Sequence, residues 1–578
     1  SQANGVVVGT RYRATFTISN YVSGDIDINV GGNTRQGSYA ANGNYTVDIV
    51  CFGGNSLYFQ EDSSGGGVGF TGSISNISVK EYTSADMDVT RATAATRVDE
   101  DGLVNYAEII GGEELQDGDF ELTGTQAESI TGTYWTTGSK WIISNNSAYT
   151  DATSYSNLHQ NSVFEVGKTY TLSIEVSGGN CRVYLGTSAT SFYVLTNGLN
   201  TITAVSEGDK LTFRPYTTPT TISNISVKEV TRDNVPRIDY TGGGCPHILA
   251  EPQRRNLVTY SEVISNQTLL IGGAGTYTIT DNYTNSPEGV QNASRVQMSI
   301  VDTNDGANYS LIALNSSMTN GVTREISFYA KSLTGLNQEV LVYWSTAKQI
   351  VTLTNDWQRF EISGTSDNSG AVLIGARGGT TQYYSGGDAN LDFAIWGLQV
   401  EDDGSGGGSS YATSYIPTSG STVTRNQDIF TRDGIGSLIN STEGVLFVEM
   451  AALSDDETNR EITLSDGIGS NYVLIRFNSG GSNRIYTRVD VGGALEYYDL
   501  NTSHTITNNN KIAIRWGASN FATFINGVEA GSQLSGSSFS ADTLTELNFD
   551  NGAGGGNFYG KVKQLQVYDT ALTDEQLL

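Results

Sequence analysis

Residues 73–81 read Ser-Ile-Ser-Asn-Ile-Ser-Val-Lys-Glu, and residues 221–229 repeat this stretch almost unchanged as Thr-Ile-Ser-Asn-Ile-Ser-Val-Lys-Glu. A weaker third copy runs from Leu391 to Glu401. In each copy apolar and polar residues alternate with a period of two, which is the pattern of a strand with one buried face. A Val-Thr-Arg triplet follows each copy, ending at Arg91, Arg232 and Arg425. The repeat therefore includes the connector after the strand and indicates duplicated β modules.

The match extends upstream of the first two copies. Residues 8–18 parallel residues 166–176, and in both a glycine turn leads into a strand of alternating aromatic and β-branched residues. Residues 113–165 precede this strand in the second module, whereas only residues 1–7 precede it in the first. We therefore expect the first module to lack its opening strands and the chain to be a piece of a longer protein.

Composition excludes two classes of partner. The chain has 578 residues, 68 of them glycine, and its 61 acids against 32 lysines and arginines give a formal net charge of −29. A nucleic-acid backbone is bound by clustered Lys and Arg, so this balance argues against nucleic acid. No apolar run approaches the ~20 residues of a membrane helix, so we expect no membrane insertion. The glycines read as turns between short strands.

From residue 426 the strands become longer, and Asn526-Gly527 between two apolar runs is a hairpin signal. The third connector contains Gly404-Ser-Gly-Gly-Gly-Ser-Ser410, which predicts an exposed, flexible loop. These patterns predict seven segments. They are a partial jelly-roll module (1–84), a first connector (85–112), a second jelly-roll module (113–230), a second connector (231–255), a third jelly-roll module (256–402), a Gly/Ser-rich third connector (403–425) and a C-terminal sandwich (426–578).

Two groups of motifs carry a family resemblance. The C-terminal motifs Phe-Ile-Asn-Gly-Val at 524–528 and Tyr-Gly-Lys-Val-Lys-Gln-Leu-Gln-Val-Tyr at 559–568 resemble the closing signature of laminin-G, or concanavalin A-like, β-sandwiches. The three earlier modules resemble the jelly-roll, carbohydrate-binding-module-like domains of bacteriophage structural proteins. The connectors are similar to those of phage virion proteins at residues 94–103, 237–246, 249–262 and 414–425.

This resemblance implies an all-β protein of tandem jelly-roll β-sandwiches followed by a concanavalin A-like β-sandwich. It also implies a non-enzymatic appendage of the virion, such as a tail or head fibre, that forms a homo-oligomer, by analogy a trimer. Its partners would be other virion proteins and host-surface glycans, and its location the extracellular particle. Two alternatives use the same modules: a secreted or surface carbohydrate-binding adhesin of a bacterium, and the binding modules of a larger polysaccharide-degrading protein.

Glycan binding needs an aromatic platform beside polar groups. Six aromatic residues are candidates for this platform in the second and third modules: Tyr134, Trp135, Tyr343, Trp344, Tyr383 and Tyr384. The alternative for the strand residues among them is packing in a sandwich core.

Calcium is the one cofactor that the sequence suggests, because it is held by loop carboxylates and carbonyls. The candidates are Asp117, Asp119 and Glu121, which alternate at the opening of the second module, and Asp550 before a glycine-rich loop. Solvated acidic turns are the alternative. The three histidines and three cysteines have no metal-ligand spacing, and we predict no catalytic residue.

Overall fold

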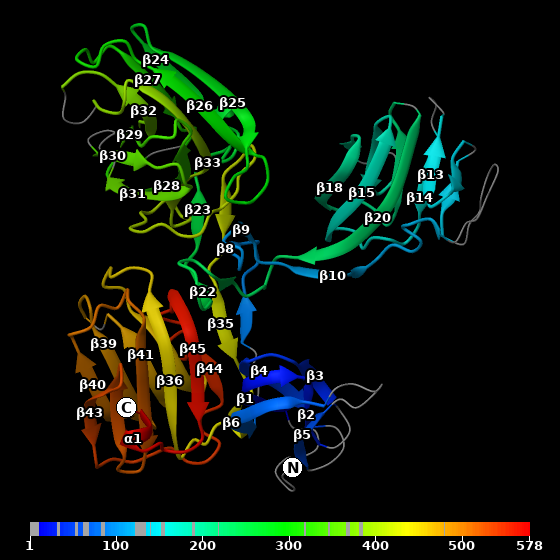
Figure 1. Cartoon of the computed structure of the whole chain (residues 1–578). Coiled ribbons are helices and arrows are strands. Elements are labelled where there is room, and N and C mark those ends of the chain that lie inside the picture. Colours follow the sequence, from blue (N-terminus) through cyan, green and yellow to red (C-terminus); the bar gives the residue numbers. More distant parts are fainter. Residues whose placement is uncertain are drawn as a thin grey trace. The chain divides into compact units, whose positions relative to one another are not determined.

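The computed structural model shows a chain built almost wholly from β-strands, with one short helix, α1 (Asp574–Leu577), near its C-terminus (Figure 1). None of the described helices is long and apolar enough to cross a membrane. The chain divides into two compact units, Ser1–Met87 and Asp88–Leu578. The structure describes residues 11–31, 35–51, 56–61, 69–81, 87–121, 134–138, 140–151, 156–187, 191–217, 219–316, 319–344, 347–365, 370–380, 385–478 and 480–577.

The first unit contains two antiparallel sheets around an aromatic core. Phe16 lies at its centre, with its ring centroid 5.1 Å from that of Tyr39 and 5.0 Å from that of Phe59. One sheet has the order β4 (Gly43–Val50), β1 (Arg11–Ser23), β6 (Thr71–Glu81). The other has the order β3 (Arg35–Tyr39), β2 (Ile26–Val30), β5 (Leu57–Glu61).

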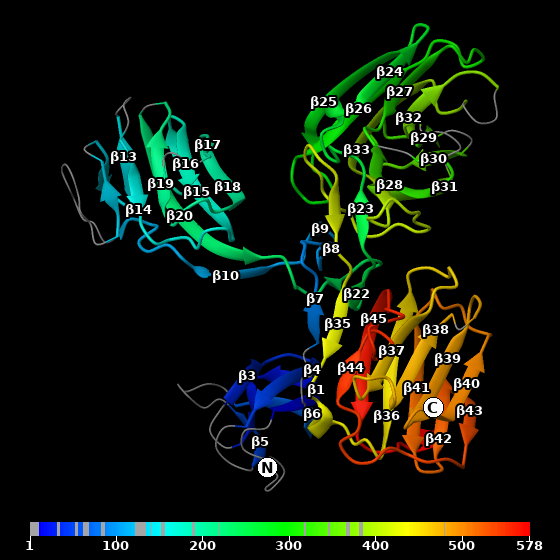
Figure 2. The same ribbon diagram turned by 180° about the vertical axis from the view of Figure 1, so that it is seen from behind.

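The second module is a sandwich of two antiparallel sheets (Figure 2). Its core holds Trp141, whose indole Nε1 donates to the carbonyl of Ser156 at 3.0 Å. The larger sheet has the order β12 (Ile142–Ser144), β13 (Ser147–Thr150), β20 (Thr220–Thr231), β15 (Thr169–Gly178), β18 (Gly198–Val205), with β10 (Ile109–Glu113) also paired to β20. The other has the order β11 (Thr136–Thr137), β14 (Leu158–Gln160), β19 (Leu211–Pro215), β16 (Cys181–Leu185), β17 (Tyr193–Leu195).

The third module has the same two-sheet build around a large apolar core. One sheet has the order β25 (Thr276–Thr284), β26 (Ala293–Ser299), β33 (Asn390–Asp402), β23 (Arg254–Asn256), β34 (Val423–Arg425), and β28 (Thr323–Ser332) joins β33 to β31 (Gln358–Thr365). The other has the order β24 (Thr268–Gly272), β27 (Tyr309–Ala313), β32 (Leu373–Arg377), β29 (Gln338–Trp344), β30 (Ala347–Leu353).

The C-terminal sandwich pairs two seven-stranded sheets. The Asn526-Gly527 turn joins two of its strands, with φ values of 53° and 77°, as the hairpin signal predicts. One sheet has the order β21 (Ile238–Asp239), β22 (His247–Ala250), β45 (Gly560–Tyr568), β36 (Glu443–Ala452), β41 (Asn510–Gly517), β42 (Phe521–Ile525), β43 (Val528–Gln533). The other has the order β40 (Ala494–Asn501), β39 (Ile485–Val491), β38 (Tyr472–Phe477), β37 (Arg460–Ser465), β44 (Glu546–Asn548), β35 (Ile429–Arg432), β7 (Asp88–Thr90).

The sequence repeat corresponds to one structural device. All three copies form strands, β6, β20 and β33, as predicted, and each carries a bulge at the same place against its neighbour. The bulge residues are Asn76, Asn224 and Gly397, with φ of 52°, 48° and 68°. Asn and Gly are the residues that adopt this left-handed conformation at least cost. The repeated asparagine is therefore a backbone requirement of the sandwich.

The connectors are ordered parts of the fold. β7 of the first connector and β21 and β22 of the second extend the two sheets of the C-terminal sandwich, while β34 of the third connector extends a sheet of the third module. The prediction that the third connector is exposed holds only in part: Ser405 and Ser410 are exposed, whereas Ser409, Thr413, Tyr415 and Ile416 are buried. The physical reason is polar pairing: the carboxylate of Glu401 accepts from the backbone N–H of Thr413 at 2.9 Å and from its hydroxyl at 2.8 Å.

A buried cluster of charges joins the connectors, and we call it the connector charge cluster: Arg91, Arg237, Glu251, Arg425 and Asp428. Arg91 pairs with Asp428 at 2.6 Å, Arg425 pairs with Glu251 at 2.6 Å, and Arg237 pairs with both acids. Burial alone would raise the pKa of Glu251, but Arg237 and Arg425 hold it well below its ordinary value. Two of the three repeated Val-Thr-Arg triplets thus supply arginines to one cluster.

Candidate functional site

In the second module, the predicted pair Tyr134 and Trp135 is split between surface and core. The indole of Trp135 is buried against Phe120 and Phe213, and its Nε1 donates to the carbonyl of Asp117 at 2.9 Å. A ring enclosed in this way has no free face for a sugar, so the prediction for Trp135 is corrected. Tyr134 is exposed.

In the third module, Tyr343 and Trp344 are both buried, which corrects their assignment as a sugar platform. Trp344 packs over Gly364, where an added Cβ would lie 2.1 Å from the indole. Tyr343 belongs to a small apolar cluster on the other face of β29, and its hydroxyl accepts from Arg377 at 3.2 Å. The other two predicted residues, Tyr383 and Tyr384, lie outside the described residues.

The predicted calcium ligands do not converge. Among the described residues no three His, Cys, Asp or Glu side chains are placed to hold a metal ion, so Asp117, Asp119 and Glu121 do not form such a group. Asp550 is buried, and its carboxylate accepts from the backbone N–H of Gly552 at 2.7 Å. Burial raises the pKa of Asp550, as expected for a carboxyl with little solvent. This side chain fixes the turn of the glycine-rich loop.

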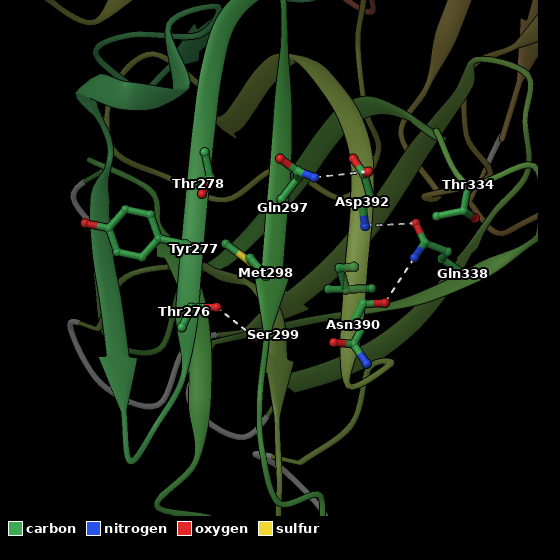
Figure 3. A pocket seen from close by; sticks show the side chains of 11 residues that line it. Thr276, Tyr277, Thr278, Gln297, Met298, Ser299, Thr334, Gln338, Asn390 and Asp392 are labelled. Carbon is green, nitrogen blue, oxygen red and sulfur yellow. Dashed lines mark hydrogen bonds between the residues drawn. The ribbon is translucent and has the colours of Figure 1, made fainter.

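A shallow groove of 370 Å³ crosses β25, β26 and β33 in the third module (Figure 3). Its polar groups are occupied with one another: Gln297 donates to Asp392 at 3.3 Å, and Gln338 donates to the carbonyl of Asn390 at 3.1 Å. Figure 3 shows the ring of Tyr277 turned away from these side chains. The groove therefore lacks an aromatic platform and has few unused hydrogen-bonding groups.

A larger hollow of 740 Å³ is lined by parts of the connectors, the third module and the C-terminal sandwich. Tyr329 and Trp357 contribute rings to its wall, and several of its charged side chains already have hydrogen-bond partners. Arg359 donates to Glu361 at 2.7 Å, and Asp239 accepts from the backbone N–H of Val98 at 2.9 Å. These two side chains are therefore engaged within the protein.

The strongest candidate surface lies on the outer face of the β19–β16–β17 sheet in the second module, and we call it the Arg182 face. Strand register places Arg182 directly opposite Val194 on one side and Arg214 on the other. Because side chains two residues apart share a face, Phe192 and Tyr216 flank this row. The side chains of Phe192, Val194 and Tyr216 are 45%, 43% and 52% exposed, which is unusual for large apolar groups that lie together.

The guanidinium of Arg182 is clamped between the two exposed rings. Its central carbon lies 4.4 Å from the ring centroid of Phe192 and 4.3 Å from that of Tyr216. Tyr184, two residues from Arg182 on the same face of β16, is buried beside this arrangement, with its ring centroid 5.7 Å from that of Phe192. Cation–π contacts on both sides fix the orientation of an otherwise flexible side chain.

Sequence reasoning missed the Arg182 face. The period of two does place Arg214 and Tyr216 on the face opposite the core residue Phe213, so the outward direction of these side chains was available. The pairing of β16 with both β19 and β17 was not, because it joins segments separated by loops. Without that pairing, no pattern brings Arg182 between Phe192 and Tyr216.

Comparison with known proteins agrees with this architecture. Residues 447–578 match a family model described as the concanavalin A-like lectin/glucanases superfamily. No curated protein is similar enough in sequence to count as a relative.

Two solved structures are similar at 11% identity. The N-terminal CBM22-1-CBM22-2 tandem domain of Paenibacillus barcinonensis Xyn10C matches with a TM-score of 0.19 over 50% of this chain and 97% of its own. Domains LG4-5 of the mouse laminin alpha1 chain match with a TM-score of 0.18 over 46% of this chain and 90% of theirs. By its own strand order and the family match at its C-terminus, the chain is an all-β protein of tandem jelly-roll β-sandwiches, followed by a β-sandwich similar to the concanavalin A-like superfamily.

Proposed function

We propose that this chain is a non-enzymatic appendage protein of a bacteriophage particle, which attaches to the host surface by binding glycans. The observation that carries glycan binding is the clamp of Arg182 between the exposed rings of Phe192 and Tyr216. Exposed rings give the C–H face of a sugar an apolar surface, while a fixed guanidinium donates to its oxygens. The virion assignment rests on the resemblance of the modules and connectors to phage structural proteins.

Attachment through such a surface depends on copy number. A shallow sheet face without an enclosing pocket binds weakly, and several copies on one particle raise the effective concentration of each remaining site. A homotrimer, the arrangement common among fibres, would present three equivalent Arg182 faces. The partners are then host glycans, together with the virion proteins that hold the appendage.

Glycan binding is tested with the full chain on a glycan array. We expect Phe192→Ala and Tyr216→Ala to lower binding about fivefold each, since stacking on an aromatic ring contributes around 1 kcal/mol. Tyr149→Ala is the matched control, because Tyr149 is an exposed tyrosine in the other sheet of the same module. Equal binding by all four proteins would move the site elsewhere, and no binding by the wild type would overturn the glycan proposal.

The location needs a separate experiment. Antibodies against the chain should label purified phage particles in electron micrographs. Labelling of the bacterial envelope with unlabelled particles would overturn the virion assignment and support the adhesin alternative. Release of reducing sugars by the full-length gene product would overturn the non-enzymatic assignment.

A further inference from the structure

We propose that the Arg182 face is selective for acidic saccharides, in which a carboxylate on the sugar pairs with Arg182. This inference rests on the proposed glycan binding and specifies its ligand class. Acidic residues outnumber basic ones in this chain. The chain carries 61 acids against 32 lysines and arginines, so an arginine held at the surface is expected to have an acidic partner.

Arg182 has none among the described residues. Of the described arginines that lie over an aromatic ring, it is the one whose guanidinium makes neither an ion pair nor a hydrogen bond. Arg295 shows the usual arrangement: it lies 4.9 Å from the ring centroid of Tyr283 and pairs with Asp392 at 2.6 Å. Arg182 thus has no acidic partner among the described residues while its rotamer is fixed, and because its Nε is buried, a ligand would meet the terminal guanidinium nitrogens.

A second cation, Arg214, belongs to the same face. Arg214 is directly opposite Arg182 on the neighbouring strand, so two positively charged side chains start from adjacent positions of this face. A carboxylate bound to Arg182 would be attracted by both charges. The planar guanidinium also matches the two oxygens of a carboxylate in a bidentate geometry, which adds directional preference to charge.

The surroundings favour a sugar acid over a small inorganic anion. Phe192, Val194 and Tyr216 expose apolar surface around the guanidinium, and an inorganic anion would leave that surface in contact with water. A uronic-acid-type residue can make both contacts: its carboxylate can pair with Arg182, and its ring face can stack on an aromatic side chain.

The test compares two forms of one polysaccharide with the full chain. Polygalacturonate and its carboxyl-reduced counterpart differ in the carboxylate alone, and each is immobilised for biolayer interferometry at about 0.15 M salt, where the screening length is about 8 Å. Alginate and polysialic acid, with their carboxyl-reduced forms, widen the panel to other acidic sugars. Inorganic phosphate in solution serves as the competitor that reports simple anion binding.

We expect the wild type to prefer at least one acidic form over its reduced counterpart. Arg182→Gln should weaken binding to that acidic form about tenfold or more, because a charge-assisted pair contributes about 1.5–3 kcal/mol. The same variant should leave binding to the reduced form nearly unchanged. Arg182→Lys should fall between the two, since it keeps the charge and loses the bidentate geometry. Arg295→Gln, which removes the same charge from an acid-paired site, should bind as the wild type does.

Other binding results would contradict the proposal. Equal binding to both forms of every polysaccharide would overturn acidic selectivity and leave glycan binding standing. Binding to none of them, with none on the wider array, would overturn the proposed function itself. Full displacement by inorganic phosphate would show an anion site without sugar recognition, and loss in Arg295→Gln instead of Arg182→Gln would assign recognition to the groove of the third module.

Discussion

A guanidinium nitrogen of Arg91 donates to Oδ1 of Asp428, 337 residues further along the chain, at 2.6 Å, with both side chains excluded from solvent. Arg237 approaches the other carboxylate oxygen of Asp428, so one acid holds arginines from two connectors. The backbone N–H of Glu251 donates to the same oxygen at 2.8 Å. Segments that precede the second module, precede the third module and follow the third module are thereby fixed at one point.

The first prediction concerns this point. Asp428→Asn should destabilise the protein by about 3–5 kcal/mol, because it leaves buried arginines without their counter-charge. Asp88→Asn is the matched control: Asp88 pairs with Arg432 at 3.4 Å at the surface, where such a pair contributes ~0–1 kcal/mol. Scanning calorimetry of the wild type, Asp428→Asn and Asp88→Asn measures their melting temperatures. Equal melting temperatures would mean that the cluster contributes no more than a surface pair.

The second prediction concerns pH and Glu325. Burial, with the nearby Glu401 and Glu361, raises the pKa of Glu325 from 4.5 to about 7. Between these values the folded chain keeps a proton that the unfolded chain has lost, so rising pH removes stability through this range. Glu325→Gln imitates the protonated form and lacks this loss.

The difference in melting temperature, Glu325→Gln minus wild type, should therefore grow from pH 4.5 to 7 and level off above that range. Glu339→Gln, an exposed change in the same module, should show no such trend. A difference that stays constant with pH would contradict the raised pKa.

The third prediction concerns the repeated bulge. Asn224→Val should cost about 1–2 kcal/mol, because a β-branched residue is poorly suited to the left-handed backbone at this position. Asn224→Gly should be far milder, since glycine already occupies the equivalent position, Gly397, of the third module. Thermal unfolding followed by circular dichroism separates the two variants. Equal effects would show that the asparagine side chain, and not its backbone, is required.

The fourth prediction concerns Trp344. Gly364→Ala should destabilise the third module by about 1–3 kcal/mol, because the new methyl group overlaps the buried indole. Gly321→Ala is the control for adding a side chain at a glycine, since an added Cβ there meets open space. Its φ of 76° still makes alanine unfavourable, but we expect a smaller loss of stability than for Gly364→Ala. Glycan binding by both variants should match the wild type, because Trp344 is part of the core. Loss of binding in Gly364→Ala without loss of stability would return Trp344 to the list of binding residues.

The repeated strand and its period of two were enough to predict sandwiches, because alternation reflects one buried face. The same rule failed at Tyr343-Trp344: both faces of β29 are covered, so neither neighbour reaches solvent. Composition also misled in part at the third connector, where the hydroxyl of Ser409 donates to the backbone carbonyl of Glu401 and the hydroxyl of Thr413 donates to its buried carboxylate. Contacts like that of Arg91 with Asp428 depend on chain segments too distant for any local pattern to connect.

The strands β7, β21 and β22 show how the modules are inserted into the chain. They belong to the sheets of the C-terminal sandwich, yet they lie in the sequence before the third module, and β7 also precedes the second. The second and third modules are therefore insertions whose ends return to a common base. A recombination event that exchanges the residues between two of these return points would replace a whole module and leave the strands of the base unchanged, so one sandwich can be exchanged without altering the C-terminal one.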